Sequence, residues 1–119
     1  MDAIPEYDAR YLAGIAAFNR GDYFEAHEVW EELWKDCPPQ ERLFIQSLIQ
    51  AAVALYHWSR TNPAGASRLL AAGREKMQGY RPDHSGLNVD DFWTRVAACL
   101  TNDRPRPPMP IIELANRLN

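Results

Sequence analysis

The segment FEAHEVWEELW, residues 24–34, places one histidine and four glutamates among two tryptophans. His27 and Glu31 are four residues apart, so on a helix their side chains lie on the same side and can touch. An imidazole nitrogen and a carboxylate oxygen at this spacing can act as a general base and its orienting partner, or bind a divalent metal ion together. On a helical wheel the other three glutamates fall on a separate, solvated side. The candidate chemistry of this helix therefore depends on His27 and Glu31.

A second set of polar side chains lies in the long apolar run that follows. Gln46, Gln50 and His57 fall within about 40° of one another on a helical wheel. A buried amide or imidazole without a partner costs roughly 1–3 kcal/mol, so these groups need polar partners, water or a ligand. The nearest partners along the chain are His27 and Glu31. We therefore expect these five side chains to converge at one internal or cleft position.

Three interpretations of this cluster stay open. The side chains can form a structural hydrogen-bond network that fixes the register of two helices. Alternatively, His27, Glu31 and His57 bind a divalent metal ion, with Gln46 and Gln50 orienting the ligands and water completing the coordination shell. Metal-assisted hydrolysis is then the expected reaction class, because a metal lowers the pKa of a bound water. In the third interpretation the base and its partner act without a metal, although no nucleophile is visible.

Capping and turn signals predict the elements that must position these residues. They indicate helices over residues 7–18, 22–34, 41–60, 62–80 and 88–100. The third of these is apolar nearly all round, which is typical of a helix buried on most sides. No strand pattern competes with them. We predict an all-α fold: a compact bundle of helical hairpins, with four to five principal helices and a central buried helix, forming a single domain over residues 1–119.

Two further segments carry weaker signals. The loop DHSG should leave His84 exposed to solvent. The proline-rich stretch RPRPPMP should run extended, strapping the C-terminal part of the chain to the body, and IIELANRL should form a last short turn of helix.

A faint internal repeat is also present. GDYFEAHEVWEELWKDCP has the Gly-x-Tyr-x-x-Ala…Pro layout of a tetratricopeptide unit, and TNPAGASRLLAAGREKMQGYRP echoes it. Ala26 and Ala66 are 40 residues apart, whereas the usual period is about 34 and three or more units are generally needed. We expect helical-hairpin packing distantly similar to that repeat, without a peptide-binding array.

Composition argues against several classes of partner. The 119 residues are 46% hydrophobic and carry a net charge of −3, so no basic field attracts nucleic acid or an anionic membrane surface. The N-terminus MDAIPEYDAR lacks the basic and apolar regions of a signal peptide, and no apolar run approaches the roughly 18 residues of a membrane span. Cys37 and Cys99 lack metal-type spacing and should be free thiols. We expect a cytoplasmic protein. A homodimer through a helix face is an open alternative, and no other protein partner is indicated.

The spacing His27-x-x-x-Glu31-x-x-Trp34, followed by LIQAAVALYHW and NPAGASRLL, resembles the bacterial and archaeal family catalogued as domain of unknown function 309. The resemblance covers about residues 18–82 and leaves 83–119 as an extra helix with a proline-rich C-terminal segment. It implies a small all-α domain and a metal-binding role suggested for the motif, with no established activity. Trp34 lies on the same face as His27, so we expect it to wall the site.

Two functions are therefore expected. The first is a divalent-metal site at the motif, serving metal-assisted hydrolysis if the protein is an enzyme. The alternative is a non-enzymatic helical-hairpin interaction module in which the polar cluster is structural. An open coordination position beside a solvent-filled pocket would favour the first function, and a saturated network beside an apolar groove would favour the second.

Overall fold

The computed structural model describes residues 7–101 and 107–115. Within these ranges the chain forms five α-helices, which confirms the all-α prediction: α1 Ala9–Asn19, α2 Tyr23–Asp36, α3 Arg42–Ser59, α4 Pro63–Lys76 and α5 Val89–Cys99. Two 3-10 turns, η1 Pro39–Glu41 and η2 Met77–Tyr80, and two short strands, β1 Asp83–His84 and β2 Leu87–Asn88, complete the order of elements. None of the described helices combines the length and the apolar character that crossing a bilayer requires.

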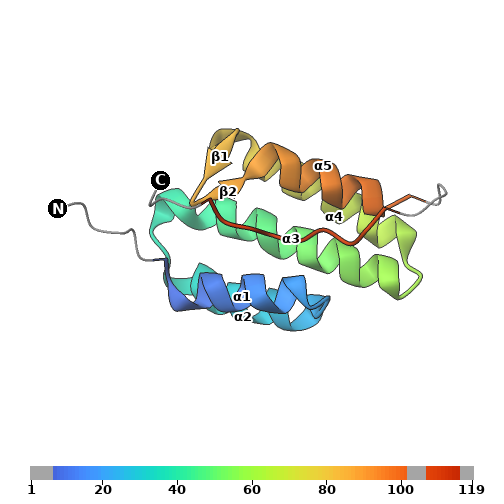
Figure 1. Ribbon diagram of the computed structural model, residues 1–119, viewed down its shortest axis with the longest axis horizontal. Coiled ribbons are helices and arrows are strands. Elements are labelled where there is room, and N and C mark those ends of the chain that lie inside the picture. Colours follow the sequence, from blue (N-terminus) through green and yellow to red (C-terminus); the bar gives the residue numbers. More distant parts are fainter. Residues whose placement is uncertain (1–6, 102–106, 116–119) are drawn as a thin grey trace.

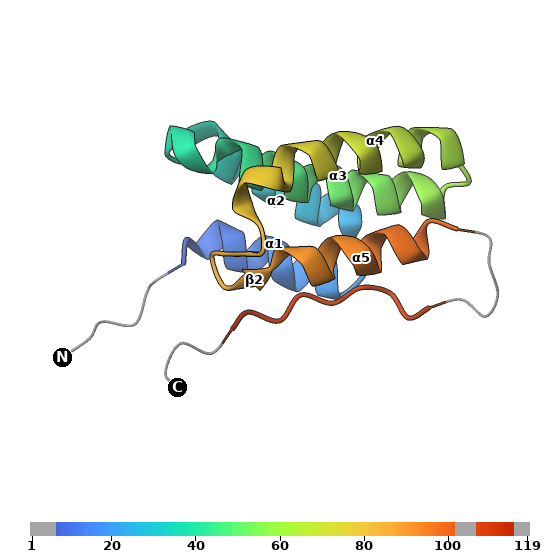
Figure 2. The same ribbon diagram turned by 90° about the horizontal axis from the view of Figure 1, so that it is seen from above.

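The helices form two layers. α3 lies between α2 and α4 in one layer, while α1, α5 and residues 107–115 cover one face of that layer (Figures 1 and 2). The core between the layers is aromatic: the Phe18 ring centroid lies 6.0 Å from that of Trp30 and 5.6 Å from that of Phe92. Nine residues of α3 are buried. The central helix is therefore enclosed on most sides, as its apolar sequence predicts.

The helix starts follow from local side-chain chemistry. Asn62 Oδ1 accepts a hydrogen bond from the Gly65 amide at 3.1 Å, directly before Pro63. Asn88 Oδ1 accepts from the Asp91 amide at 3.0 Å. Each cap satisfies a backbone donor that has no partner inside the helix, which fixes where α4 and α5 begin.

The structure adds one short hairpin to the predicted helices. β1 and β2 pair in an antiparallel hairpin, with Asp83 opposite Asn88 and His84 opposite Leu87. The two turn residues, Ser85 and Gly86, have φ values of 47° and 78°, which is the left-handed conformation that a two-residue hairpin needs. Strands of two residues are too short to give a periodic sequence pattern.

His84 was wrongly expected to be exposed. Its side chain is 27% exposed, and Nε2 lies 2.7 Å from Glu41 Oε1. The imidazole ring packs against Phe44 and Tyr80, with ring centroids 4.6 and 4.7 Å away. The hairpin is thereby tied to the start of α3.

The C-terminal segment also differs from the prediction. Residues 111–115 are extended and do not form a helical turn; the rest of IIELANRL, and residues 104–106 of the proline-rich stretch, lie outside the described residues. The physical reason is that the body engages the backbone: the Asn19 side-chain amide bonds to the backbone N and O of Ile112 at 2.8 and 2.9 Å. The Ala115 amide donates to the Gly86 carbonyl at 2.8 Å. We call residues 107–115 the strap.

Close packing of α1 on α2 gives a first prediction. A Cβ added at Gly14 would overlap the indole of Trp30, which is fully buried and cannot move aside. We expect Gly14→Ala to lower the free energy of unfolding by about 1–3 kcal/mol, because overpacking outweighs the gain in helix propensity. Urea denaturation measures this change. Gly79→Ala is the control, since a Cβ there meets no atom within 4 Å; equal effects of the two substitutions would contradict the packing argument.

Burial of Tyr23 gives a second prediction. The Tyr23 hydroxyl is buried without a hydrogen-bond partner in the described structure, and burial, with a smaller contribution from Cys99, raises its pKa to about 12. The folded state disfavours the tyrosinate, so it gains stability from keeping Tyr23 protonated. This gain is complete below the ordinary tyrosine pKa and is lost as pH rises through about 12. We expect Tyr23→Phe to reduce the loss of stability above pH 10, measured by urea denaturation across that range. An unchanged alkaline profile would rule out this role of Tyr23.

Candidate functional site

His27 and Glu31 meet on one side of α2, as their spacing predicts. His27 Nε2 lies 3.2 Å from Glu31 Oε1, and the two side chains are 21% and 50% exposed. His27 Nδ1 lies 3.0 Å from the carbonyl oxygen of Phe24. A carbonyl only accepts hydrogen bonds, so Nδ1 carries a proton and donates it to that oxygen. The histidine is thus oriented by its own helix, with Nε2 directed at the carboxylate.

This orientation limits what the pair can do. If His27 is neutral, its only ring proton is on Nδ1, and the lone pair of Nε2 faces a carboxylate oxygen of Glu31. Two acceptors at hydrogen-bonding distance repel each other unless a proton or a cation lies between them. The arrangement therefore suits either a protonated imidazole paired with a carboxylate or two ligands that share a metal ion.

A pocket of about 410 Å³ lies next to the pair. Its lining combines three residues of α2 with three of α3: Glu31, Trp34, Lys35, Gln46, Ile49 and Gln50. Glu31 thus belongs to both the histidine pair and the pocket. Both glutamines expected near the motif are in this lining, and Trp34 forms part of the wall, as the sequence analysis expects.

The polar groups of this pocket are not all satisfied within the described structure. Trp34 Nε1 and Gln50 Oε1 are buried and have no hydrogen-bond partner. The guanidinium of Arg42 stacks on the Trp34 ring, 4.3 Å from its centroid, and so keeps the indole in place. An unpaired donor and an unpaired acceptor lining one pocket do not form the saturated network that a purely structural cluster requires.

His57 does not take part in this pocket. It lies one residue after Tyr56, with ring centroids 6.1 Å apart, and it is absent from the pocket lining. Among residues 7–101 and 107–115, no group of three or more His, Cys, Asp or Glu side chains is arranged to hold a metal ion. The five expected side chains therefore do not meet at one point. Binding of a metal ion by His27, Glu31 and His57 together stays a prediction. Within the described residues of one chain, these three side chains are not brought together.

The sequence does not indicate a second imidazole–carboxylate pair, which His84 forms with Glu41. These residues are separated by 43 positions, so no local spacing indicates their contact.

Cys37 and Glu41 line another pocket, of about 340 Å³. Burial raises the pKa of the Cys37 thiol, which keeps it protonated and unsuited to act as a nucleophile.

Comparison with known proteins relates the first half of the chain to a family. The family described as "Domain of unknown function (DUF309)" matches residues 11–69. "Uncharacterized protein YpuF" of Bacillus subtilis (strain 168) is 48% identical over 86 residues, which cover 71% of this chain and 49% of that protein. An "Uncharacterized protein" of Aquifex aeolicus (strain VF5) is 28% identical over 94 residues, which cover 77% of this chain and 28% of that protein. The chain therefore spans about half the length of the first relative and less of the second.

The unpaired oxygen of Gln50 gives a third prediction. Gln50→Met removes a buried acceptor that has no partner and keeps a similar shape, so we expect the free energy of unfolding to rise by about 1 kcal/mol. Urea denaturation measures the change. Gln46→Met, at the neighbouring half-buried glutamine, is the control and should change stability by less than about 0.5 kcal/mol. A loss of stability in Gln50→Met would mean that water or a ligand satisfies this oxygen in solution.

Proposed function

Since this chain belongs to the DUF309 family through residues 11–69, whose description assigns no activity, we propose a function from the geometry of that region. His27 and Glu31 form a solvent-open, two-ligand site for a divalent metal ion on α2. The site serves the neighbouring pocket, to which Glu31 also contributes.

The orientation of His27 is the observation that carries this proposal. Its Nδ1–H donates to the Phe24 carbonyl at 3.0 Å, and Nε2 is left facing Glu31 Oε1 at 3.2 Å. Histidines that bind metals usually give their other N–H to a carbonyl or carboxylate, which fixes the tautomer and the ring orientation. One turn of helix supplies both donors and the orienting carbonyl, so the pair is formed as soon as α2 is formed.

The donor set fits some metal sites and not others. One imidazole and one carboxylate do not make the three-ligand set of a catalytic zinc site or the four-ligand set of a structural one. They do suit a divalent ion that keeps water, or groups of a bound molecule, in its remaining positions. When bound, such an ion would polarise an oxygen atom of that molecule, which is the chemistry that metal-assisted hydrolysis uses. We propose that the protein works in the cytoplasm, where a thiol such as that of Cys37 stays reduced.

A second candidate function is non-enzymatic binding of a protein partner by the same helical hairpin. Phe24 is 49% exposed, and its ring centroid lies 5.2 Å from that of His27 and 5.6 Å from that of Tyr56. Exposed aromatic side chains are enriched in protein interfaces. In this case His27 would only support the aromatic surface, and Glu31 would be a solvated partner.

Calorimetric titration of the tag-free protein with Zn²⁺, Mn²⁺ and Ni²⁺ separates these two functions. We expect saturable binding of at least one of these ions, and we expect His27→Ala and Glu31→Gln each to weaken it by at least about tenfold, because each removes a ligand. Glu28→Gln is the matched control, since this exposed glutamate lies on the same helix without a histidine partner; its affinity should not change.

Two further results test the metal proposal and the number of side chains that bind the ion. No binding of any of these ions, or equal affinities for His27→Ala and Glu28→Gln, would overturn the metal proposal and leave the interaction module. His57→Ala decides the size of the site: an unchanged affinity supports two ligands from the chain, whereas a loss as large as that of His27→Ala would make His57 the third.

A further inference from the structure

The strap is bonded to α1 and to the hairpin, and near its start the Cys99 thiol at the end of α5 donates to the Pro108 carbonyl at 3.4 Å. The Asn19 amide bonds to both backbone groups of Ile112, at 2.8 and 2.9 Å, and the Ala115 amide donates to the Gly86 carbonyl at 2.8 Å. Pro110 and Ile112 are buried, whereas Met109 and Ile111 are each 52% exposed. Alternate side chains of the strap therefore enter the body, which is the pattern of an extended strand against a groove.

Between the contacts at Pro108 and Ala115, two residues of the strap have free backbone groups. In an extended chain, successive residues present their N–H and C=O groups to opposite sides. Those of Ile112 are directed to Asn19 on α1, so those of Ile111 and Glu113 are directed away from α1. Within the described residues, no hydrogen bond uses the backbone groups of Ile111 or Glu113. The strap thus has a short unpaired edge at Ile111 and Glu113, between its contacts with α5 and with the hairpin.

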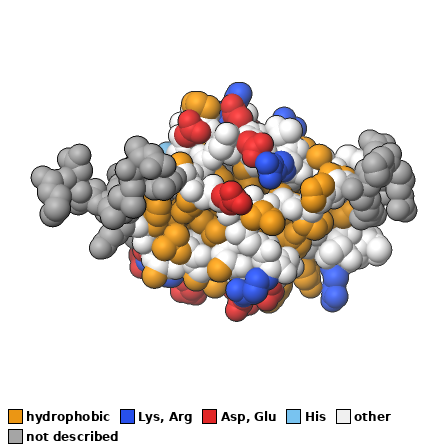
Figure 3. Space-filling model, viewed as in Figure 1, with side chains coloured by type: hydrophobic (Ala, Val, Ile, Leu, Met, Phe, Trp, Pro, Cys, Tyr) orange, Lys and Arg blue, Asp and Glu red, His pale blue; other side chains and the backbone are white. Residues whose placement is uncertain are grey.

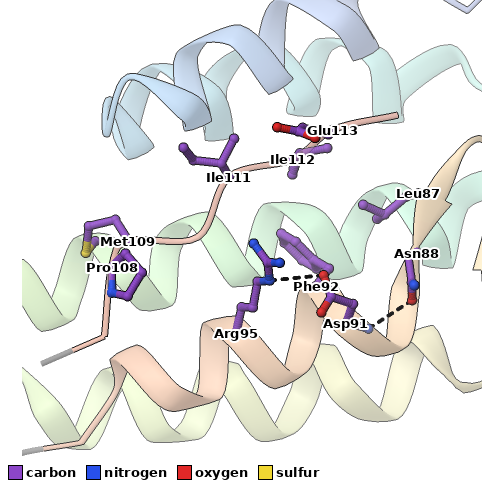
Figure 4. Close-up of a pocket in the computed structure, with 10 residues that line it drawn as sticks. All are labelled: Leu87, Asn88, Asp91, Phe92, Arg95, Pro108, Met109, Ile111, Ile112 and Glu113. Carbon is purple, nitrogen blue, oxygen red and sulfur yellow. Dashed lines mark hydrogen bonds and ion pairs between the residues drawn. The ribbon is translucent and has the colours of Figure 1, made fainter. Parts of the chain in front are cut away.

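A pocket of about 380 Å³ separates the strap from α5 (Figure 4). Phe92 and Arg95 project from α5 toward the strap, Leu87 and Asn88 lie at the hairpin end, and Pro108 and Met109 lie at the opposite end. Phe92 and Ile112, each 3% exposed, contribute apolar surface. On the face that holds the strap, hydrophobic side chains spread across the middle and are broken by a few charged groups (Figure 3). The pocket is therefore a slot between a strand edge and a helix.

We propose that this slot binds an extended peptide segment of a partner protein, which adds as a β-strand to the free edge of the strap at Ile111 and Glu113. A strand edge beside a helix is a general arrangement for binding extended peptides, because the edge provides main-chain hydrogen bonds and the groove receives alternate side chains. The apolar surface of Phe92 and Ile112 suits small β-branched side chains.

Charge in the slot indicates one further property of the peptide. Asp91 and Arg95 neutralise each other, with Arg95 Nε 3.0 Å from Asp91 Oδ2. Glu113 lines the slot and has no ion-pair partner among the described residues. A lysine or arginine of the added strand, placed opposite Glu113, would make a favourable cross-strand pair. The expected ligand is therefore an extended segment that alternates β-branched residues with a basic residue.

The test uses the full chain and a synthetic probe, the capped peptide acetyl-Val-Thr-Lys-Thr-Val-amide carrying a fluorescent label. Fluorescence anisotropy should show saturable binding below about 1 mM, as expected for a short peptide. The same peptide N-methylated at its lysine and at its last valine, whose N–H groups face the same side of an extended chain, keeps every side chain but loses the donors that would pair with the edge. We expect its affinity to be at least about tenfold lower, because hydrogen bonds to the edge are lost.

Variants of the protein test the same hydrogen bonds by changing the strap instead of the peptide. Ile111→Pro removes one edge N–H and keeps an extended backbone, so it should weaken binding by at least about fivefold. Ile111→Val keeps the N–H at the same position and should bind like the original chain. Glu113→Lys should also weaken binding of this basic probe. Thermal unfolding of each variant shows whether the fold is retained.

Two results would overturn the proposal. One is the absence of saturable binding of the probe to the original chain. The other is binding that neither N-methylation of the peptide nor Ile111→Pro weakens, since such binding would not use the strand edge. The N-methylated peptide is tested on the unaltered protein, so this arm is independent of the stability of any variant.

Discussion

The burial of α3 is the constraint on which the other elements depend. Leu48, Ala51, Ala52 and Leu55 have no more than 1% of their surface exposed, so helices must cover α3 on several sides before it is stable in water. α2 and α4 flank it in one layer, and α1, α5 and the strap cover one face of that layer (Figure 2). The stripe of polar side chains on α3 must then face outward. This places Gln46 and Gln50 beside α2.

Features that depend on nearby residues could be predicted from the sequence. The Asn62 and Asn88 caps and the contact of His27 with Glu31 each involve residues three or four positions apart. The contact of Asn19 with Ile112 joins residues 93 positions apart, and no periodicity indicates such a pairing. This explains why the helices could be predicted and the conformation of residues 111–115 could not: a distant side chain, that of Asn19, bonds to backbone groups of Ile112 that a helical turn would otherwise use.

The expected cluster of five polar side chains failed for a geometrical reason. A helical wheel gives the angle of a residue about the axis and ignores its height along it. Gln50 and His57 have similar angles, but seven residues separate them, which is about 10 Å of helical rise. Glu31 lies level with Gln46 and Gln50, since all three line one pocket, and His57 lies beyond it. The family region, residues 11–69, therefore contains the histidine pair and its pocket, while the strap lies outside that region.

The contact of Asn19 with Ile112, which we call the Asn19 clamp, also bears on the order of folding. Helical hairpins such as α2 with α3 join residues that are close along the chain, so the entropic cost of closing them is small. The clamp must close a loop of 93 positions, and its partner Ile112 follows the five described helices in the sequence. On a ribosome, the earlier helices can therefore pack while the strap is still unsynthesised. The slot beside α5 forms only after residues 107–115 have been added to the packed helices.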